Sequence, residues 1–335
     1  SLVGSEMCIR DRQWKDQVIV GRTHYAAAQP TSLGKRLAMF GEEMLQAYNH
    51  LENLCDRYPL RGLKGAVGTG LDQLTLLGND SDRLDKLQFL IREHLGFAKE
   101  INSVGQVYPR SLDFEAVSSL YQMGSGVANL SRTLRLMAGG EMVTEGFAQG
   151  QVGSSAMPHK MNTRSTARVN GFQMIIGGYL HMIGGLNGDQ WFEGDVSCSV
   201  VRRVALPDSF FAFDGMIETM LHVLEDMGIY EAVIERDVER YLPFLSTTTL
   251  LMEAVQKGAG REQAHEAIKE HAVATDLYLR EGQPEKDLSQ RLADDNRFPL
   301  SSAEIKGILE RSRSLTGLAH HQVDHFIRAA DTLVK

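Results

Sequence analysis

AVSSLYQMGSGVANLSRTLRLM occupies residues 116–137 and shows the clearest periodicity in the chain. Its apolar residues recur at alternating steps of four and three: Ala116, Leu120, Met123, Val127, Leu130, Leu134 and Met137. That spacing places them on one stripe of a long α-helix, as is typical of helices packed in a bundle. We therefore predict an all-α protein built on a bundle of long helices.

Two neighbouring stretches have the same helical spacing and recognisable ends. One runs over residues 33–51 and follows Thr31 and Ser32, whose hydroxyl groups suit an N-cap. The other runs over residues 84–95 and precedes Gly96, which suits the C-terminal cap of a helix. Both are predicted to be helices.

The helical pattern continues over residues 169–186 and 210–224. The first of these stretches contains several glycines, which indicate close approach of neighbouring helices. Pro207 precedes the second stretch, and we expect it in a first turn or at a kink. No stretch alternates convincingly between apolar and polar residues, so no β-sheet is predicted.

The domain organisation follows from where the long helices end. From Pro243 the predicted helices become shorter and more polar. We therefore predict a central long-helix bundle domain over residues 13–242 and a smaller C-terminal helical domain over residues 243–335. The opening SLVGSEMCIRDR lacks the features of a signal peptide and fits neither domain, so we interpret residues 1–12 as an unrelated or artefactual start.

Composition excludes several classes of protein. The net charge of −8, with 23% charged residues, does not give the basic surface that nucleic acids or anionic membranes require. No run of about 18 apolar residues could span a membrane. Cys8, Cys55 and Cys198 form neither a disulfide framework nor a Cys-x-x-Cys zinc site. We expect a cytoplasmic protein that uses no metal or other cofactor and binds neither nucleic acid nor membrane.

Four polar, glycine-containing segments are not explained by helical periodicity: residues 21–31, 62–70, 102–110 and 150–162. Loops that join core helices and carry specific polar groups often form binding sites. The last segment reads GQVGSSAMPHKMN. Its Lys160 and Asn162 can hold a carboxylate group of a ligand.

Several of these segments resemble known enzymes. GSSAMPHKMN at residues 153–162 resembles the GSSxMPxKxN loop of the fumarase and aspartase superfamily. GRTHYAAAQPT at residues 21–31 is similar to the Thr-His segment of that superfamily, and VGQVYPRSLDF at residues 104–114 to its third substrate-binding stretch. Residues 189–215 and 260–272 resemble the adenylosuccinate lyase family in particular.

The resemblance implies a lyase that eliminates fumarate from adenylosuccinate, giving AMP. It implies the same reaction on succinylaminoimidazole carboxamide ribotide, giving AICAR, in purine nucleotide biosynthesis. Alternatives are another superfamily lyase of the argininosuccinate or carboxymuconate type, or a non-catalytic helical fragment on the same fold. A serine hydrolase is a weaker alternative, because no Gly-x-Ser-x-Gly elbow is present.

The resemblance also implies a homotetramer in which segments of three subunits build each active site. The apolar stripe over residues 116–137 would suit a bundle shared between subunits, whereas a bundle within one chain is the alternative. The N-terminal domain usual in the family has no counterpart before the Thr-His segment. We therefore expect that domain to be missing and the chain alone to be inactive or poorly folded.

The resemblance assigns two catalytic roles. Ser154 would be the general base that removes a proton from the carbon next to a carboxylate, and a serine needs strong activation to do this. His24 would be the general acid that protonates the departing nitrogen, a role suited to its ordinary pKa of about 6.5. Lys160, a backbone N–H group or a helix N-terminus could activate Ser154.

The matched segments also supply contacts with the substrate. Thr23, Lys160 and Asn162 would bind the succinyl carboxylates. The remaining predicted substrate-binding residues are Arg22, Thr69, Gln106, Arg110, Ser155, Ser199 and Arg203. Arg203 could instead be a helix-surface arginine, and Arg110 could pair within a helix terminus.

One position departs from the superfamily pattern. Where relatives carry a glutamate thought to hold the general-acid histidine, this chain has Ala167. Alanine accepts no hydrogen bond, so His24 would lose both its orientation and an opposite charge. Glu193 or Glu145 could substitute, or Arg168 could shift the local register.

Overall fold

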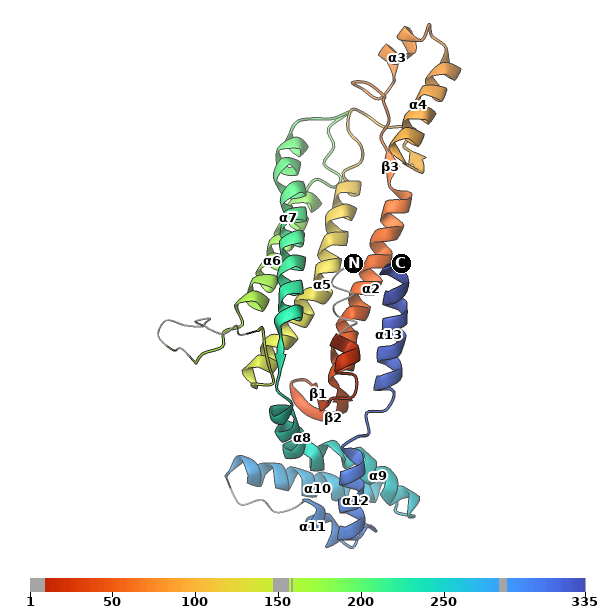
Figure 1. Ribbon diagram of the computed structural model, residues 1–335. Helices are drawn as coiled ribbons and strands as arrows, with labels where there is room; N and C mark the ends of the chain where they lie inside the picture. Colours follow the sequence, from red (N-terminus) through yellow and green to blue (C-terminus); the bar gives the residue numbers. More distant parts are fainter. Residues whose placement is uncertain (1–9, 147–156, 158, 283–287, 335) are drawn as a thin grey trace.

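Four long helices form the body of the molecule, and the predicted all-α long-helix bundle is confirmed (Figure 1). The computed structural model of the chain describes residues 10–146, 157, 159–282 and 288–334. The long helices are α2 (Leu33–Arg57), α5 (Ser111–Gly139), α6 (Arg164–Gly184) and α7 (Ser197–Asp226). In the part of the chain described, no helix is both long and apolar enough to cross a membrane.

The helix ends confirm the caps expected from the sequence. The Ser32 hydroxyl accepts a hydrogen bond from the backbone N–H of Lys35 at 3.2 Å, which satisfies a free donor in the first turn of α2. Helix α4 (Ser81–Leu95) begins after Asp80 and ends at Gly96, whose φ is +74°. Only glycine adopts that left-handed conformation without strain.

The apolar stripe of α5 is buried within the chain. Leu130, Val127 and Leu134 are at most 3% exposed and lie in the same core cluster as Phe40 of α2 and Met216 of α7. The stripe therefore builds the intrachain core. Ala116 and Met123 of the stripe are only partly buried, and a bundle shared between subunits stays a prediction.

Short strands are present, contrary to the prediction of no sheet. The strands β1 (Val18–Thr23) and β2 (Ala26–Ser32) form an antiparallel hairpin where a loop was expected. Its sequence hides this, because alanines and a proline in β2 are poor strand formers. The other pairs have two residues per strand: β3 (Pro59–Leu60) with β4 (Lys99–Glu100), and β5 (Val143–Thr144) with β6 (Gly228–Ile229).

Helix α7 begins earlier than the periodicity indicated. It starts at Ser197 and continues through Pro207, which therefore lies in the helix interior and not in a first turn. Proline has no N–H, so the carbonyl group of Arg203 loses its usual helical partner. Packing of α7 on α6 and α5 in the main core outweighs that loss.

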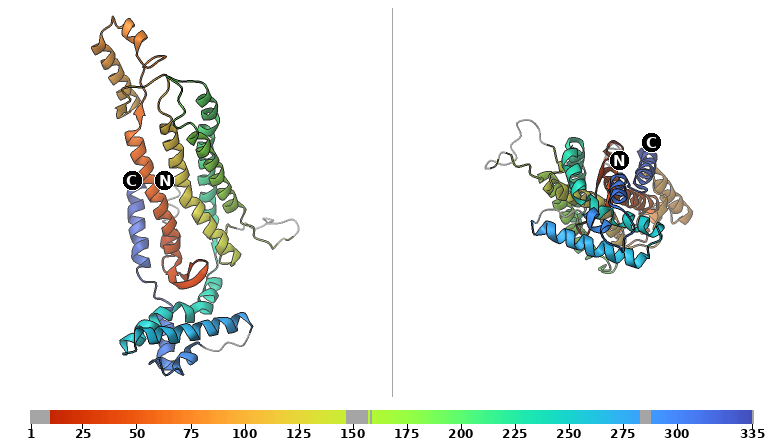
Figure 2. Two further views of the ribbon diagram at one scale, coloured as in Figure 1. Left: turned by 180° about the vertical axis from the view of Figure 1, so that it is seen from behind. Right: turned by 90° about the horizontal axis from the view of Figure 1, so that it is seen from below.

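Shorter helices occupy both ends of the bundle (Figures 1 and 2). Helices α3 (Leu71–Leu76) and α4 lie at one end. At the other end lie α8 (Glu231–Leu245), α9 (Thr247–Gln256), α10 (Arg261–Arg280), α11 (Leu288–Ala293) and α12 (Ser302–Ser312). Leu250, Leu292 and Ile305 belong to a separate apolar cluster among these helices. The division into two domains at residues 242 and 243 stays a prediction.

The last helix, α13 (Ala319–Val334), returns to the bundle and packs along α2. Phe326 of α13 lies against Gly41 of α2, where an added Cβ atom would overlap its ring. The absence of a side chain at Gly41 therefore allows this contact.

Asp11 is an unusual buried group near the start of the described chain. It is 0% exposed, and neither carboxylate oxygen has a hydrogen-bond partner among the described residues. Burial raises the pKa of Asp11 to about 8. The interpretation of residues 1–12 as an unrelated start stays a prediction.

We predict that Asp11 makes stability fall as the pH rises. The unfolded carboxyl group titrates near ~3.9, below its folded pKa, so its contribution is most favourable below that pH and declines towards pH 8. Asp11→Asn should raise the melting temperature at pH 7.5 by at least ~3 °C and have little effect at pH 4. Asp56→Asn, at an exposed position, is the control. Equal melting temperatures for Asp11→Asn and the unsubstituted chain at pH 7.5 would contradict this.

Candidate active site

The predicted general acid, His24, lies at the tip of the β1–β2 hairpin. Thr23 pairs with Ala26, so His24 and Tyr25 form a two-residue turn, with φ values of +49° and +66°. Positive φ at both central residues defines a type I′ turn, which usually contains Asn-Gly. Larger side chains there cost conformational energy, and such strain is often kept at functional sites. Thr23 and His24 are both exposed.

Arg22 anchors this hairpin to α8. Its Nη2 atom donates to both carboxylate oxygens of Asp237 at 2.9 Å, and its guanidinium lies 5.0 Å from the ring centroid of Tyr241. Burial opposes the charge of Arg22, but the hydrogen bond and charge of Asp237 raise its pKa overall. Within one chain, Arg22 thus holds the base of the turn.

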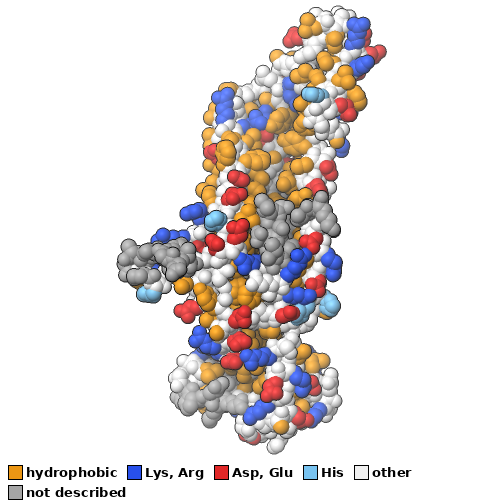
Figure 3. Space-filling view, in the orientation of Figure 1, with side chains coloured by type: hydrophobic (Ala, Val, Ile, Leu, Met, Phe, Trp, Pro, Cys, Tyr) orange, Lys and Arg blue, Asp and Glu red, His pale blue; other side chains and the backbone are white. Residues whose placement is uncertain are grey.

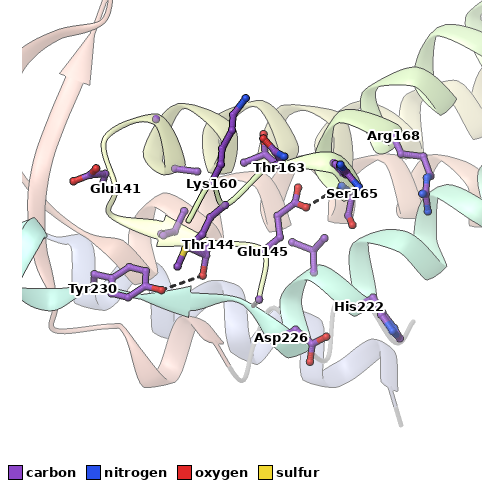
Figure 4. Close-up of a pocket in the computed structure, with 18 of the residues that line it drawn as sticks. Glu141, Thr144, Glu145, Lys160, Thr163, Ser165, Arg168, His222, Asp226 and Tyr230 are labelled. Carbon is purple, nitrogen blue, oxygen red and sulfur yellow. Dashed lines mark hydrogen bonds between the residues drawn. The ribbon is translucent and has the colours of Figure 1, made fainter. Parts of the chain in front are cut away.

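Lys160 and Asn162 line a cleft of about 1040 Å³ where α6 begins and α7 ends (Figure 4). Ser154 and Ser155, the predicted base and its neighbour, lie outside the described residues. The Glu145 carboxylate accepts hydrogen bonds from the backbone N–H groups of Ser165 at 2.9 Å and Thr166 at 2.7 Å. Glu145 therefore caps the N-terminus of α6, where its negative charge is favourable.

Among the described residues, the structure shows no side chain that orients His24. Ala167 is exposed on the first turn of α6, and Glu145 is engaged as the cap. Glu193 lies with the loop at the opposite end of the bundle, where its carbonyl oxygen accepts from the N–H of Gln106 at 2.8 Å. His24 has no hydrogen-bond partner among the described residues, so neither carboxylate replaces the missing glutamate inside one chain.

A second group of predicted residues lies at the α3–α4 end of the bundle. Gln106 is exposed in the loop before α5, and Ser199 and Arg203 lie on the first turns of α7. Thr69 is exposed in a turn between Gly68 and Gly70, both of which have positive φ.

Asp113 fixes the loop of Gln106 to α7. Its buried carboxylate accepts from the Tyr108 hydroxyl at 2.6 Å and from Arg202 Nε at 2.6 Å. Arg110 is also buried and donates to Asp113 at 3.3 Å, so it pairs internally, as the alternative interpretation proposed. Burial and the adjacent Asp113 raise the pKa of Tyr108, so its hydroxyl stays protonated. Of the two adjacent arginines Arg202 and Arg203, Arg203 is the exposed one.

The two groups are too far apart to share one small ligand. Ser199 lies near the start of α7, whereas His222 and Asp226 near its end line the cleft of Lys160 (Figure 4). At ~1.5 Å per residue, these ends are roughly 40 Å apart. The hairpin of His24 lies at the Lys160 end (Figure 1). One chain therefore brings the hairpin and Lys160 to the same end and keeps Gln106, Ser199 and Arg203 away from them.

Some residues of the cleft were not predicted. His222, Asp226 and Tyr230 line it, and the Tyr230 hydroxyl lies 3.5 Å from that of Thr144 (Figure 4). Their sequence context is an ordinary amphipathic helix end. They line the cleft because the C-terminal end of α7 packs beside the start of α6. No local sequence motif indicates that packing.

Two family models match the chain. A family model described as "Lyase" matches residues 6–178. The chain belongs to this lyase family. A second family model, described as "Adenylosuccinate lyase C-terminus", matches residues 243–326 of the lyase chain.

Two curated relatives of the chain are named adenylosuccinate lyase. Adenylosuccinate lyase of Saccharomyces cerevisiae is 32% identical over 316 residues, which cover 94% of this chain and 65% of the yeast protein. That of Pyrococcus horikoshii is 34% identical over 263 residues, covering 76% of this chain and 55% of the relative. The lyase chain thus spans about 65% of the length of the yeast protein. The resemblance to adenylosuccinate lyases is confirmed.

Solved structures confirm the fold of the lyase. The 3-carboxy-cis,cis-muconate lactonizing enzyme of Pseudomonas putida superposes with a TM-score of 0.82 at 21% identity, covering 100% of this chain and 71% of that one. Fumarate lyase of Mesorhizobium sp. BNC1 superposes with a TM-score of 0.79 at 17% identity, and the match covers 98% of this chain and 70% of that one. At these identities the likeness concerns the fold alone.

We predict that the Arg22–Asp237 pair stabilises the hairpin. Asp237→Ala should lower the free energy of unfolding by ~1–3 kcal/mol, because Arg22 is left partly buried without its partner. Hydrogen exchange of the β1–β2 amides should accelerate. Glu239→Ala on the same helix removes an exposed pair with Arg313 and should change stability by less than ~1 kcal/mol. Equal effects of the two substitutions would show that the pair does not hold the hairpin.

Proposed function

We propose that this lyase eliminates fumarate from adenylosuccinate, giving AMP, and from succinylaminoimidazole carboxamide ribotide, giving AICAR. The observation that carries the proposal is the match to the adenylosuccinate lyase C-terminus at residues 243–326. It adds to the similarity to the yeast enzyme over 94% of the chain. The common superfamily loop does not distinguish substrates, whereas this C-terminal match favours adenylosuccinate.

The residues support an acid–base elimination. Ser154 takes a proton from the carbon next to a succinyl carboxylate, the carbon–nitrogen bond breaks, and His24 gives a proton to the departing nitrogen. Thr23, Lys160 and Asn162 hold the carboxylates as charge develops. The exposed position of His24 suits this role, because its imidazole is free to meet a ligand.

We further propose a homotetramer whose active sites are shared between subunits. The roughly 40 Å between Ser199 and the cleft supports sharing, because one substrate cannot reach both groups in one chain. An exposed apolar face on α6 and α7 supports assembly: Met174 is 77% and Phe211 is 72% exposed. Figure 3 shows hydrophobic side chains gathered along the bundle. Large exposed apolar patches commonly mark protein interfaces.

The proposed location is the cytoplasm. Cys55 and Cys198 are free thiols in the structure, and free cysteines fit a reducing compartment.

Activity is tested by offering adenylosuccinate, argininosuccinate, aspartate and malate in parallel and following absorbance. Because the chain spans 65% of the yeast relative, the assay uses both this chain and a fusion that adds the preceding segment of the yeast enzyme. We expect the fusion to convert adenylosuccinate alone among the four. Turnover of another substrate in its place would overturn the assignment.

We predict that His24→Ala and Ser154→Ala each lower turnover in the fusion by at least ~100-fold, as loss of a general acid or base does. Both variants should keep the unsubstituted melting temperature. His94→Ala, which removes an exposed histidine on α4, should retain full activity. Near-normal activity of either catalytic variant would remove that residue from its role.

We also predict that the α6–α7 face holds the tetramer together. Sedimentation of the unsubstituted protein should give a tetramer, and the double variant Met174→Asp/Phe211→Asp should dissociate it, because it places charge on an apolar interface. Leu315→Asp, at a residue that is 52% exposed between α12 and α13, is the control. A stable, folded monomer of the unsubstituted protein would contradict the tetramer.

A further inference from the structure

A second cleft, of about 680 Å³, lies beside the hairpin of His24, between α2, α5 and α8. We call it the arginine cleft. Its charged residues are Arg22, Arg36, Arg236, Arg240 and Asp237. It adjoins the Lys160 cleft, because Val233 of α8 lines both.

Helical spacing brings these charges together. Arg236 and Asp237 lie four and three residues before Arg240 on α8, so each of them neighbours Arg240 on the helix surface. Arg36 comes from the first turns of α2, and Arg22 from β1. The convergence therefore depends on three elements that are packed into fixed positions.

The cleft has an excess of positive charge. Among the described residues that line it, Asp237 is the only acidic one, and it already pairs with Arg22 at 2.9 Å. Arg36 donates one hydrogen bond, to the carbonyl oxygen of Val20 at 2.7 Å. In the part of the chain that the structure describes, no carboxylate pairs with Arg36, Arg236 or Arg240. Four guanidinium groups in the cleft thus share the charge of one carboxylate, and those of Arg236 and Arg240 are exposed to solvent.

The other acidic residues of α8 are directed elsewhere. Glu239 pairs with Arg313 at 3.2 Å. Glu231 and Glu235 are exposed and do not line the arginine cleft.

Arg36 is a partly buried arginine of this cleft. Burial and the charge of Arg22 lower its pKa to about 10, with Asp237 acting in the opposite direction. A negative group in the cleft would offset both effects. The native chain supplies only Asp237, which is the partner of Arg22.

One wall of the arginine cleft is apolar. Met39 and Leu136 are 48% and 54% exposed there, and the rings of Tyr25 and Tyr241 lie beside the arginines. Such a wall can hold the uncharged body of a ligand whose anionic end meets the guanidinium groups.

We propose that the arginine cleft binds a phosphate group, carried either as inorganic phosphate or on a mononucleotide. Planar guanidinium groups donate paired hydrogen bonds to phosphate oxygens, and a phosphate dianion matches the uncompensated charge of this cleft better than a single carboxylate does. Apart from Arg22, the site uses none of the residues assigned to the elimination. It does not depend on lyase activity.

The test is calorimetric titration of the chain with inorganic phosphate, AMP and adenosine at constant ionic strength. We expect saturable binding of phosphate with one site per chain. AMP is also the product of the proposed reaction, so only the part of AMP binding that Arg236→Ala/Arg240→Ala weakens is assigned to the arginine cleft. The double variant Arg236→Ala/Arg240→Ala should weaken the binding of phosphate and of AMP by at least ~10-fold, because it removes two charge-assisted contacts. Tighter binding of AMP than of phosphate identifies the mononucleotide as the source, and equal binding identifies free phosphate; adenosine should not bind.

The matched control is Arg132→Ala/Arg135→Ala, which removes two exposed arginines from α5 outside the cleft. It should bind phosphate as the unsubstituted chain does, with all variants melting at similar temperatures. His24→Ala should also keep phosphate binding, which separates this site from the proposed catalytic one. No saturable phosphate or AMP binding, or equal weakening by both double variants, would overturn the proposal. Loss of binding in His24→Ala alone would also overturn it.

Discussion

Close packing of α5 against α2, α6 and α7 holds the two groups of candidate site residues apart. At Gly126 of α5, an added Cβ atom would lie 2.6 Å from Cγ of Met44 on α2, so these helices touch through the glycine backbone. Gly124 similarly admits the side chain of Gln173 from α6. Helices packed this closely do not slide or shorten, so the ends of the bundle stay roughly 40 Å apart.

Each end of this rigid body displays an incomplete set of groups. One end has an imidazole on a strained turn, with Lys160 and Asn162 in the neighbouring cleft. The other has Gln106, Ser199 and Arg203 around the Tyr108–Asp113–Arg202 network. Under the proposed homotetramer, a reaction that needs an acid, a base and several anion contacts would be completed where ends of different subunits meet. His24 has no hydrogen-bond partner among the described residues, which is consistent with the proposal that another subunit completes its surroundings.

The sequence predicts those parts of the structure that local physics determines. The caps at Ser32 and Gly96 follow from backbone chemistry, and the stripe on α5 follows from helical period. Glycine was interpreted correctly at Gly177, which lies against Tyr121, but Gly171 has no described atom within 4 Å of an added Cβ. Local sequence does not show which of these glycines lies against a neighbouring helix.

What the sequence missed depends on tertiary contacts. The hairpin forms although its second strand is poor in strand formers, because β1 and β2 pack on α8 through Val20 and Val238. Pro207 is tolerated inside α7 because that helix is held by the core. Arg202 pairs with Asp113, whereas Arg203 is exposed. The sequence does not distinguish these two adjacent arginines, because the difference depends on which helix packs beside them. The motif segments were recognised, yet their placement at opposite ends follows only from the helix directions.

The most direct test of the shared site is complementation between subunits. His24→Ala and Arg203→Ala, each made in the fusion with the yeast segment, carry substitutions at opposite ends of the bundle, and each is expected to be inactive alone. They are mixed under conditions in which subunits exchange, and adenylosuccinate turnover is compared with that of each variant alone. The shared-site account predicts turnover well above the sum of the two, because some mixed sites combine an intact His24 with an intact Arg203 from another subunit. Mixed oligomers that form but remain as inactive as the separate variants would contradict it.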